Sequence, residues 1–321
     1  MKKILITIPM EEEHKKRINE IAFDAEIKYC SVEKITKKDV CDAEIILGNV
    51  PVNFIKESIN LKWLHLNSAG ANNYTEKDIL KEGTILTNST GAYGLAIAEH
   101  MLAVLLSLQK KIYIYTENQK NHLWKDEGEV VSIYGAKTLV VGLGDIGNEF
   151  ALRMNALGSK VYGIRKHKAE KPLYIEKMYE IEELEKIISE FDVVAVFLPE
   201  TRETINLFDK SKFKMMKKSA VFLNAGRGST VNTKDLYEAL NEEIIKGAGI
   251  DVVDIEPLPK ESPLWNAKNI LITPHVSGGY HLKETLKRVR NIAISNLEAY
   301  YKNEAMKNIV DFKTGYKKFI E

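Results

Sequence analysis

Three glycines near the middle of the chain, Gly142, Gly144 and Gly147, constrain the fold more than any other feature. They follow the short apolar run 138–141 with the spacing G-x-G-x-x-G, and residues 148–157 have a helical pattern. In a strand–turn–helix unit, the first glycine permits a tight turn and the second lets a pyrophosphate approach the backbone. The third lets the helix pack closely on the sheet, and the helix N-terminus then faces the anion.

The glycine motif alone is a weak signal, because a glycine turn can join any buried strand to a helix. Here the predicted helix ends at Gly158 and residues 160–164 form a second apolar strand, which completes a βαβ unit of the expected length. We therefore predict a dinucleotide site that includes Gly142, Gly144, Asp145, Ile146 and Gly147.

Length and charge limit the remaining possibilities. A chain of 321 residues favours two domains, and 46 basic against 45 acidic side chains give no electrostatic reason to expect nucleic acid or an anionic membrane as partner. The apolar helix at 96–108 contains Glu99 and His100 and is too short to span a bilayer. Cys30 and Cys41 lack metal-ligand spacing, so we expect reduced thiols, no metal site and a cytoplasmic protein.

Strand-like and helix-like segments alternate along the whole chain, which predicts an α/β fold with parallel sheets. The predicted strands are 4–8, 26–30, 45–47, 62–66 and 84–87, then 138–141, 160–164, 191–198, 220–223, 247–250 and 270–273. The second group is almost entirely apolar, as in a sheet covered on both faces. We predict a Rossmann-type doubly wound, dinucleotide-binding domain at 94–285 and a smaller flavodoxin-like substrate domain at 1–93 plus 286–321.

Polar residues follow three strands of the second domain, at the edge where open α/β sheets bind ligands. Arg227 lies between two glycines, where its guanidinium can hold a carboxylate through two parallel hydrogen bonds; the alternative is a surface salt bridge. His275 can act as acid and base, and Glu256 nearby favours its imidazolium form, which can protonate a developing alkoxide. Alone, His275 is more typical of a core histidine, but beside Arg227, Glu256 and a dinucleotide site we predict that it is catalytic.

A further candidate lies in the first domain. Residues 67–70 follow the strand 62–66, and their small side chains leave backbone N–H groups available at its carboxyl end. This arrangement suits an anion, but it is equally typical of an ordinary strand-to-helix turn.

In order and spacing, these motifs resemble the D-isomer-specific 2-hydroxyacid dehydrogenases over nearly the whole chain. The resemblance implies hydride transfer from a nicotinamide to a 2-oxo acid, with Arg227 holding its carboxylate and carbonyl oxygens, His275 protonating the oxygen and Glu256 orienting His275. It also implies a homodimer formed through the cofactor domain. The further residues that it implies are Ala225, Gly226 and Asp251 at the cofactor and the backbone of Ser68, Ala69 and Gly70 at the substrate carboxylate.

The second strand of the cofactor domain bears on the choice of cofactor. NAD sites usually have an Asp or Glu there, which accepts from the ribose 2′-OH. Residues 163–168 contain no acid, and Arg165 with Lys166 or Lys168 can instead pair with a 2′-phosphate. We therefore predict a preference for NADP over NAD; the alternative is a solvated basic turn.

The substrate remains open at this stage. Glyoxylate and hydroxypyruvate reductases fit the pattern, as do reductases of bulkier 2-oxo acids. Two alternatives are a D-3-phosphoglycerate dehydrogenase lacking a regulatory domain and an NAD(P)-binding corepressor-like sensor, although the chain has no long basic or disordered extension of the kind expected for a sensor. Formate dehydrogenases match less well, because they do not use a proton-donating pair such as Glu256 and His275.

Overall fold

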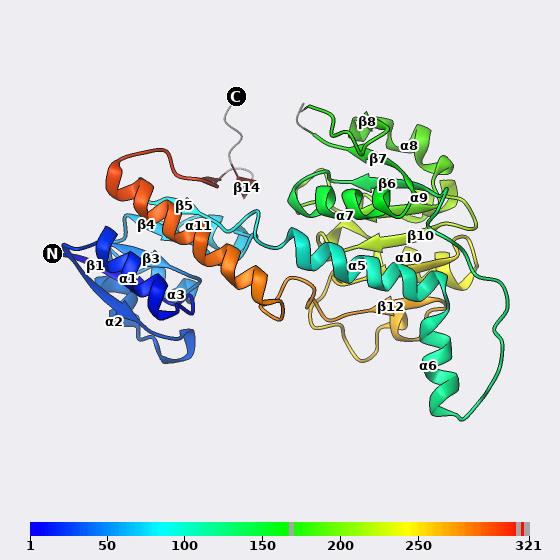
Figure 1. Cartoon of the computed structure of the whole chain (residues 1–321), viewed down its shortest axis with the longest axis horizontal. Coiled ribbons are helices and arrows are strands. Elements are labelled where there is room, and N and C mark those ends of the chain that lie inside the picture. The colour runs from blue at the N-terminus through cyan, green and yellow to red at the C-terminus, as the bar shows by residue number, and fades with distance from the viewer. Residues whose placement is uncertain (167–169, 313–315, 318–321) are drawn as a thin grey trace. The chain divides into compact units, whose positions relative to one another are not determined.

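The structure is a computed structural model that describes residues 1–166, 170–312 and 316–317. The chain divides into two compact units (Figure 1): unit 1 comprises Met1–Tyr93 and Tyr280–Glu321, and unit 2 comprises Gly94–Gly279. The chain thus leaves unit 1 after Tyr93 and returns to it at Tyr280. The sequence places this return later, at residue 286. Each unit contains its own parallel sheet with flanking helices.

Unit 1 is built around a five-stranded parallel sheet in the order β2-β1-β3-β4-β5. This is the strand order of flavodoxin-like folds, and the five predicted strands are confirmed with small shifts at their ends. The elements of unit 1 are β1 (Lys2–Ile6), α1 (Glu12–Ile21), β2 (Ala25–Tyr29), α2 (Lys37–Asp42), β3 (Ile45–Leu47), α3 (Val52–Ile55), β4 (Trp63–His65), α4 (Asn72–Thr75), β5 (Ile85–Thr87), α11 (Lys283–Lys302), β13 (Val310–Asp311) and β14 (Tyr316–Lys317).

Apolar side chains fix the helices of unit 1 on its sheet. Helices α1 and α11 lie side by side over one face (Figure 1). Trp63 of β4 is fully buried and stacks on Tyr300 of α11, with ring centroids 5.2 Å apart. Burial of such a ring stabilises the fold by about 2–3 kcal/mol, so the indole anchors α11 above the strand that leads into residues 67–70.

Unit 2 contains a seven-stranded parallel sheet in the order β12-β11-β10-β9-β6-β7-β8. The chain enters at β6, proceeds to one edge and returns to β9, so the topological switch point of this Rossmann-type sheet lies between β6 and β9. The elements of unit 2 are α5 (Gly94–Gln109), α6 (Ile112–Lys120), β6 (Lys137–Val141), α7 (Asp145–Ala156), β7 (Lys160–Ile164), β8 (Lys177–Tyr179), α8 (Leu184–Ile187), β9 (Val193–Val196), α9 (Lys210–Met215), β10 (Val221–Asn224), α10 (Thr233–Asn241), β11 (Gly247–Ile250) and β12 (Ile270–Ile272).

The six strands predicted for this sheet are present, but β8 was not predicted. It is a three-residue edge strand whose residues are exposed or only partly buried, so it lacks the apolar run that marks the interior strands. Small residues in β11 have a clear role, because a Cβ on Gly249 would lie only 2.3 Å from Cγ1 of Val104. The strand therefore lets α5 lie close against the sheet.

Two other features of the helices bear on the function. Helix α6 and the segment after it extend away from the body of unit 2 (Figure 1). Among the described residues, no helix combines the length and the apolar character needed to cross a lipid bilayer.

Candidate active site

The glycine turn has the geometry that the sequence predicts. Gly142 has a φ of +99°, and a Cβ there would lie 2.8 Å from the carbonyl oxygen of Phe197, which follows β9. A Cβ on Gly147 would lie 2.2 Å from the carbonyl oxygen of Gly142. By contrast, a Cβ on Gly144 would meet nothing within 4 Å, and this exposed residue caps the N-terminus of α7. The tight turn, the open backbone and the helix N-terminus together fit a pyrophosphate group.

The other predicted residues of the turn lie close by in the fold. Helix α7 begins at Asp145, three residues before the predicted start, and Ile146 is in its first turn. The carboxylate of Asp145 accepts the backbone N–H of Gly94 at 3.0 Å, which ties the start of α7 to the start of α5. After β10, Ala225 is buried, and a Cβ on Gly226 would lie 2.5 Å from the carbonyl oxygen of Leu198. This turn therefore packs against the chain that follows β9, at the switch point.

Arg227 presents an uncompensated guanidinium. Its Nη1 donates to the carbonyl oxygen of Gly226 at 2.8 Å, and no carboxylate in the described part of the chain forms an ion pair with it. The surface salt bridge considered as an alternative is thus not found among these residues. The buried carboxamide of Asn224 braces the turn, because Oδ1 accepts from the N–H of Gly226 and Nδ2 donates to the carbonyl oxygen of Arg227, both at 3.0 Å.

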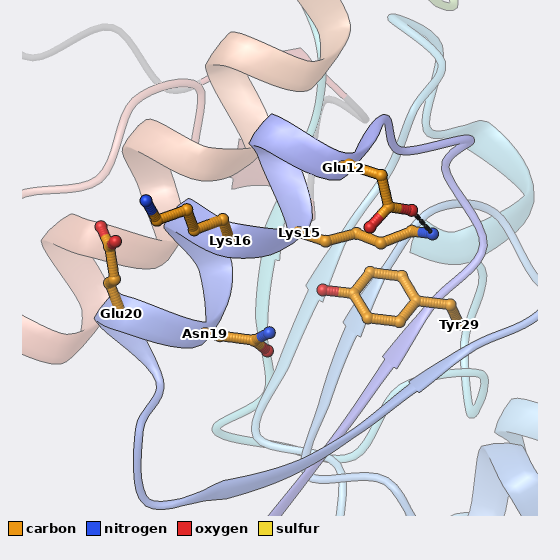
Figure 2. Close-up of a pocket in the computed structure, with 6 residues that line it drawn as sticks. All are labelled: Glu12, Lys15, Lys16, Asn19, Glu20 and Tyr29. Atoms are coloured by element: carbon orange, nitrogen blue, oxygen red, sulfur yellow. Dashed lines mark hydrogen bonds and ion pairs between the residues drawn. The ribbon is translucent and has the colours of Figure 1, made fainter.

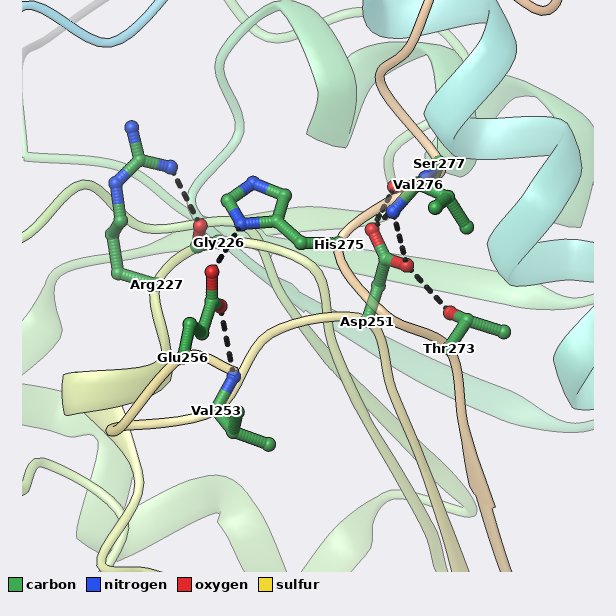
Figure 3. Close-up of polar contacts among 9 residues, drawn as sticks. All are labelled: Gly226, Arg227, Asp251, Val253, Glu256, Thr273, His275, Val276 and Ser277. Atoms are coloured by element: carbon green, nitrogen blue, oxygen red, sulfur yellow. Dashed lines mark hydrogen bonds and ion pairs between the residues drawn. The ribbon is translucent and has the colours of Figure 1, made fainter. Parts of the chain in front are cut away.

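Glu256 and His275 form a direct pair (Figure 3). Nδ1 of His275 lies 2.7 Å from Oε2 of Glu256, and the other carboxylate oxygen of Glu256 accepts the N–H of Val253 at 3.2 Å. An ionised carboxylate can only accept, so Nδ1 carries a proton and Nε2 is the atom left to exchange one with a ligand. The side chain of His275 is 50% exposed and that of Glu256 37%, so the pair is accessible.

The loops carrying these three side chains are adjacent. Strands β10, β11 and β12 are consecutive and parallel in the sheet, so their carboxyl ends share one edge. A Cβ on Gly228 would lie 1.9 Å from the carbonyl carbon of Val253, so the backbone after Arg227 packs directly on the loop that leads to Glu256. The structure therefore brings together the loops of Arg227, Glu256 and His275 at one rim of unit 2.

Asp251 holds the turn that presents His275. His275 has a φ of +52°, in the left-handed region that is uncommon for residues other than glycine, and its N–H donates to the carbonyl oxygen of Asp251 at 2.8 Å. The carboxylate of Asp251 is 1% exposed and accepts from four groups: the N–H of Val276 and of Ser277, both at 3.1 Å, the hydroxyl of Thr273 at 2.5 Å and the hydroxyl of Ser277. The surrounding bonds thus over-determine an otherwise unfavourable conformation. Contact of Asp251 with the nicotinamide stays a prediction.

The basic turn after β7 lies at the surface. Nζ of Lys166 pairs with Oε2 of Glu203 at 2.5 Å, and the two side chains are 65% and 70% exposed. Arg165 is partly buried and forms no ion pair with any described residue. Lys168 lies outside the described residues.

In unit 1, the loop after β4 has an unusual pattern of hydrogen bonds. Five successive carbonyl oxygens accept: Leu66 from the Ser89 hydroxyl, Asn67 from the Tyr93 hydroxyl, Ser68 from the Ser89 N–H, Ala69 from the Asn88 amide and Gly70 from the Ser68 hydroxyl. The N–H of Ser68 has a long contact of 3.5 Å to Oδ1 of Asn49. The N–H groups of Ala69, Gly70 and Ala71 have no acceptor within the described ranges. The carbonyl oxygens of the loop are thus all hydrogen-bonded within unit 1, whereas several of its N–H groups remain available as donors. This arrangement suits an anion.

A chain of hydrogen bonds between buried side chains, here called the buried relay, lies next to this loop. Because Ser89 donates to Leu66, His65 must donate from Nε2 to Ser89 (3.2 Å) and accept at Nδ1 from Thr87 (2.8 Å). Thr87 in turn accepts from Nε1 of Trp63 at 2.9 Å, so each group in the chain is satisfied. Burial lowers the pKa of His65 to about 3, which keeps its imidazole neutral.

The residues that sequence reasoning missed are mostly carboxamides and hydroxyls that brace these loops. Asn224 is the last residue of β10, Asn88 directly follows β5 and Asn49 lies just beyond β3, and each fixes a neighbouring turn. Asparagine at the carboxyl end of an apolar strand is the signal that was available, because its side chain can bond to nearby backbone.

Two other polar features lie on unit 1. A shallow hollow is lined by Glu12, Lys15, Lys16, Asn19, Glu20 and Tyr29 (Figure 2), none of which belongs to the predicted site. Within it Lys15 and Glu12 neutralise each other at 2.6 Å. Ligand atoms of Glu11, Glu13 and His14 also lie within 4.8 Å of one another, but the carboxylate of Glu11 already pairs with Arg290 at 2.5 Å.

Comparison with known proteins places this arrangement in a family. Residues 102–277 match the model of the D-isomer specific 2-hydroxyacid dehydrogenase NAD binding domain. A glyoxylate/hydroxypyruvate reductase B from Enterobacter sp. (strain 638) is 34% identical over 251 residues, covering 76% of each chain. A glyoxylate reductase from Korarchaeum cryptofilum is 29% identical over 281 residues, covering 84% of this chain and 83% of the relative.

A solved structure shares the whole architecture. A D-isomer specific 2-hydroxyacid dehydrogenase family protein from Aeromonas salmonicida superposes with a TM-score of 0.85 at 27% identity, covering 97% of this chain and 99% of that one. The fold and the site define a nucleotide-dependent oxidoreductase. The chain belongs to the D-isomer-specific 2-hydroxyacid dehydrogenase family, whose members interconvert 2-oxo acids and D-2-hydroxy acids with NAD(P).

Proposed function

We propose that unit 2 binds the cofactor and that Arg227, Glu256 and His275 carry out the reduction of a small 2-oxo acid. When bound, the reduced nicotinamide supplies the hydride that adds to the carbonyl carbon, so that the carbonyl oxygen becomes an alkoxide. His275 gives the proton at Nε2 to the carbonyl oxygen, while Glu256 remains ionised and stabilises the imidazolium through Nδ1. The observation that carries this proposal is the 2.7 Å pair of His275 and Glu256 on a loop packed against that of Arg227.

Arg227 and the loop at 68–70 have complementary binding roles in this proposal. The free guanidinium can donate to the carboxylate and to the carbonyl oxygen, where negative charge grows during the reaction. The N–H groups of Ala69 and Gly70, which have no acceptor in the part of the chain that the structure describes, can hold the carboxylate without adding a charge. Relatives named glyoxylate reductase and glyoxylate/hydroxypyruvate reductase support glyoxylate and hydroxypyruvate as substrates.

The test is a panel of 2-oxo acids with NADPH and NADH, followed at the absorbance of the reduced cofactor. We expect oxidation with glyoxylate or hydroxypyruvate, and less with branched or aromatic 2-oxo acids. Faster turnover of phosphohydroxypyruvate than of both small acids would redirect the assignment to a phosphoglycerate dehydrogenase. Binding of cofactor without turnover of any acid would reject the catalytic roles.

We propose NADP as the preferred cofactor. Arg165 and Lys166 follow β7, where a carboxylate in NAD-selective sites would accept from the ribose hydroxyl. The pair of Lys166 with Glu203 is too exposed to contribute more than about 1 kcal/mol, so a 2′-phosphate can displace Glu203 at little cost. Proteins of this fold hold either cofactor: a Xanthobacter autotrophicus dehydrogenase is seen with NADPH and an Aquifex aeolicus D-lactate dehydrogenase with NAD.

Kinetics with both cofactors test this preference. We expect a higher kcat/KM for NADPH than for NADH, and we expect the double substitution Arg165→Ala and Lys166→Ala to remove the difference by raising KM for NADPH alone. Lys160→Ala, on the same strand but at its far end, is the matched control. A higher kcat/KM for NADH in the unmodified protein would overturn the proposal.

We also propose a homodimer formed through unit 2, in the cytoplasm. Helix α6 and the segment up to residue 134 extend from this unit, and they carry exposed apolar side chains at Ile112, Leu123, Trp124 and Tyr134. A second copy of the chain would cover them together with part of α5. Light scattering should give a molar mass twice that of one chain. The double substitution Leu123→Ser and Trp124→Ser should lower this mass towards that of a single chain. Phe23→Ser, an exposed apolar position in unit 1, should leave it unchanged; a monomer before substitution would contradict the proposal.

A further inference from the structure

Asn67, which lies in the loop after β4, is hydrogen-bonded to two tyrosines. Its carbonyl oxygen accepts from the hydroxyl of Tyr93, and its Nδ2 donates to the hydroxyl of Tyr280 at 2.6 Å. One tyrosine therefore fixes the backbone of Asn67 and the other fixes its side chain. Linked hydrogen bonds of this kind strengthen one another.

The remaining polar groups of Asn67 are fixed by a second residue. Oδ1 of Asn67 accepts the N–H of Asn49 at 2.6 Å, and its own N–H donates to Oδ1 of Asn49 at 3.0 Å. Asn49 also donates to the hydroxyl of Ser68 at 3.1 Å. Both the peptide plane and the side chain of Asn67 are therefore determined, two residues before Ala69, where the N–H groups without an acceptor among the described residues begin.

The two tyrosines occupy special positions in the chain. Tyr93 is the last residue before the chain leaves unit 1, and Tyr280 is the first residue after it returns. Tyr93 is 8% exposed, and burial raises its pKa and that of Tyr280, so both hydroxyls stay protonated and able to donate. Both crossing segments of the chain are thus tied to one asparagine.

We propose that Asn67 is a positioning residue for the substrate carboxylate. Through its bonds to Tyr93, Tyr280 and Asn49, it holds the peptide planes of residues 67–70 so that the N–H groups of Ala69 and Gly70 stay directed at the anion, and it joins this loop to both crossing segments. The inference rests on the proposal that these N–H groups bind the carboxylate. Loss of either tyrosine bond loosens the loop without touching His275, so its effect falls on binding.

The test compares Asn67→Ala, Tyr93→Phe and Tyr280→Phe with a matched control. Tyr74→Phe also removes a buried tyrosine hydroxyl of unit 1, one that bonds to the backbone of Val50 rather than to residues 67–70. We expect these three variants to raise KM for glyoxylate about tenfold, which corresponds to one lost hydrogen bond, with kcat and the KM of the cofactor nearly unchanged. The control should lose stability only.

A double substitution adds a readout that general destabilisation would not give. Because both hydroxyls bond to the same residue, Asn67, Tyr93→Phe with Tyr280→Phe should raise KM by less than the product of the two single fold-changes. Additive effects, an unchanged KM in Asn67→Ala, or an equal rise in Tyr74→Phe would overturn the inference.

Calorimetric titration with oxalate, an unreactive carboxylate ligand, separates this inference from the proposed function. If the unmodified protein turns over no 2-oxo acid, the proposed function fails, and oxalate still tests the role of Asn67. Weaker oxalate binding in Asn67→Ala but not in Tyr74→Phe supports the inference. Equal binding in both variants, or no binding in the unmodified protein, overturns it.

Discussion

The two candidate binding regions of this protein offer opposite kinds of chemistry. In unit 1, residues 67–70 present backbone N–H groups held in place by neutral carboxamides and hydroxyls. In unit 2, the rim at β10–β12 presents an arginine on a turn braced by a carboxamide, and a histidine whose placement depends on two carboxylates. A peptide N–H can hold a carboxylate but cannot exchange a proton at the rate a catalyst needs, whereas an imidazole can do so. Changes in unit 1 should therefore appear mainly in KM, and changes at the histidine in kcat.

The largest effect is expected for His275→Ala. Loss of the proton donor should lower kcat by at least about a thousandfold, because the alkoxide would have to take its proton from water. Initial rates with saturating glyoxylate measure kcat, and quenching of tryptophan fluorescence checks that the cofactor still binds. His122→Ala, an exposed histidine elsewhere in unit 2, is the control. A kcat within tenfold of the unmodified value would remove His275 from its assigned role.

Glu256→Gln should have the next largest effect and sharpens the comparison. The amide oxygen of glutamine can still accept the hydrogen bond from the N–H of Val253. The NH2 group then faces His275, and it can neither accept a hydrogen bond from Nδ1–H nor stabilise the imidazolium. We expect kcat to fall about a hundredfold, with KM and the midpoint of thermal unfolding nearly unchanged, because the pair is largely exposed. A loss seen only in thermal stability would make Glu256 a structural residue.

Arg227→Ala should affect binding more than either preceding change. Removal of a charged hydrogen-bond donor to the carboxylate should raise KM for glyoxylate about 30-fold. Arg227→Lys should recover only part of this, since a lysine lacks the two-pronged geometry. Initial rates measure both variants, with Arg17→Ala, an exposed arginine of unit 1, as control. Full recovery by lysine would mean that charge alone matters there.

The smallest effect concerns the buried relay next to the loop of unit 1. His65 has a pKa of about 3 when folded because it is buried, compared with about 6.5 when unfolded. Between these two pKa values the unfolded state therefore binds more protons than the folded state. The contribution of His65 to the free energy of unfolding is complete above pH 6.5 and declines as the pH falls towards 3, by up to about 1.4 kcal/mol per pH unit. Urea unfolding of the unmodified protein and His65→Gln between pH 7 and 4 should show a flatter dependence in the variant. Parallel curves would exclude this role of His65.

The same contrast explains what could be predicted from the sequence. Arg227, Glu256 and His275 follow apolar strands in motifs of recognisable spacing, so the loops that meet at the rim of unit 2 could be named from the sequence. Asn67 could not be linked to two tyrosines from the sequence. Its partners are 26 and 213 positions away, and only the folded chain brings a tyrosine from each crossing segment to one asparagine.

Other differences have equally local causes. Strand β8 is too short and too exposed to produce an apolar run. The sequence predicts that Glu256 lies beside His275, but it does not show that Asp251, in the same acidic motif, points inward to four donors. Burial separates the roles of these two carboxylates, and burial depends on the tertiary fold.

Chiral analysis of the product tests the central claim most directly. If Arg227 fixes the carboxylate and the carbonyl oxygen while His275 supplies the proton, only one face of the carbonyl remains for the hydride. Reduction of hydroxypyruvate with NADPH should then yield D-glycerate alone. Formation of L-glycerate or of a racemic mixture would contradict the account.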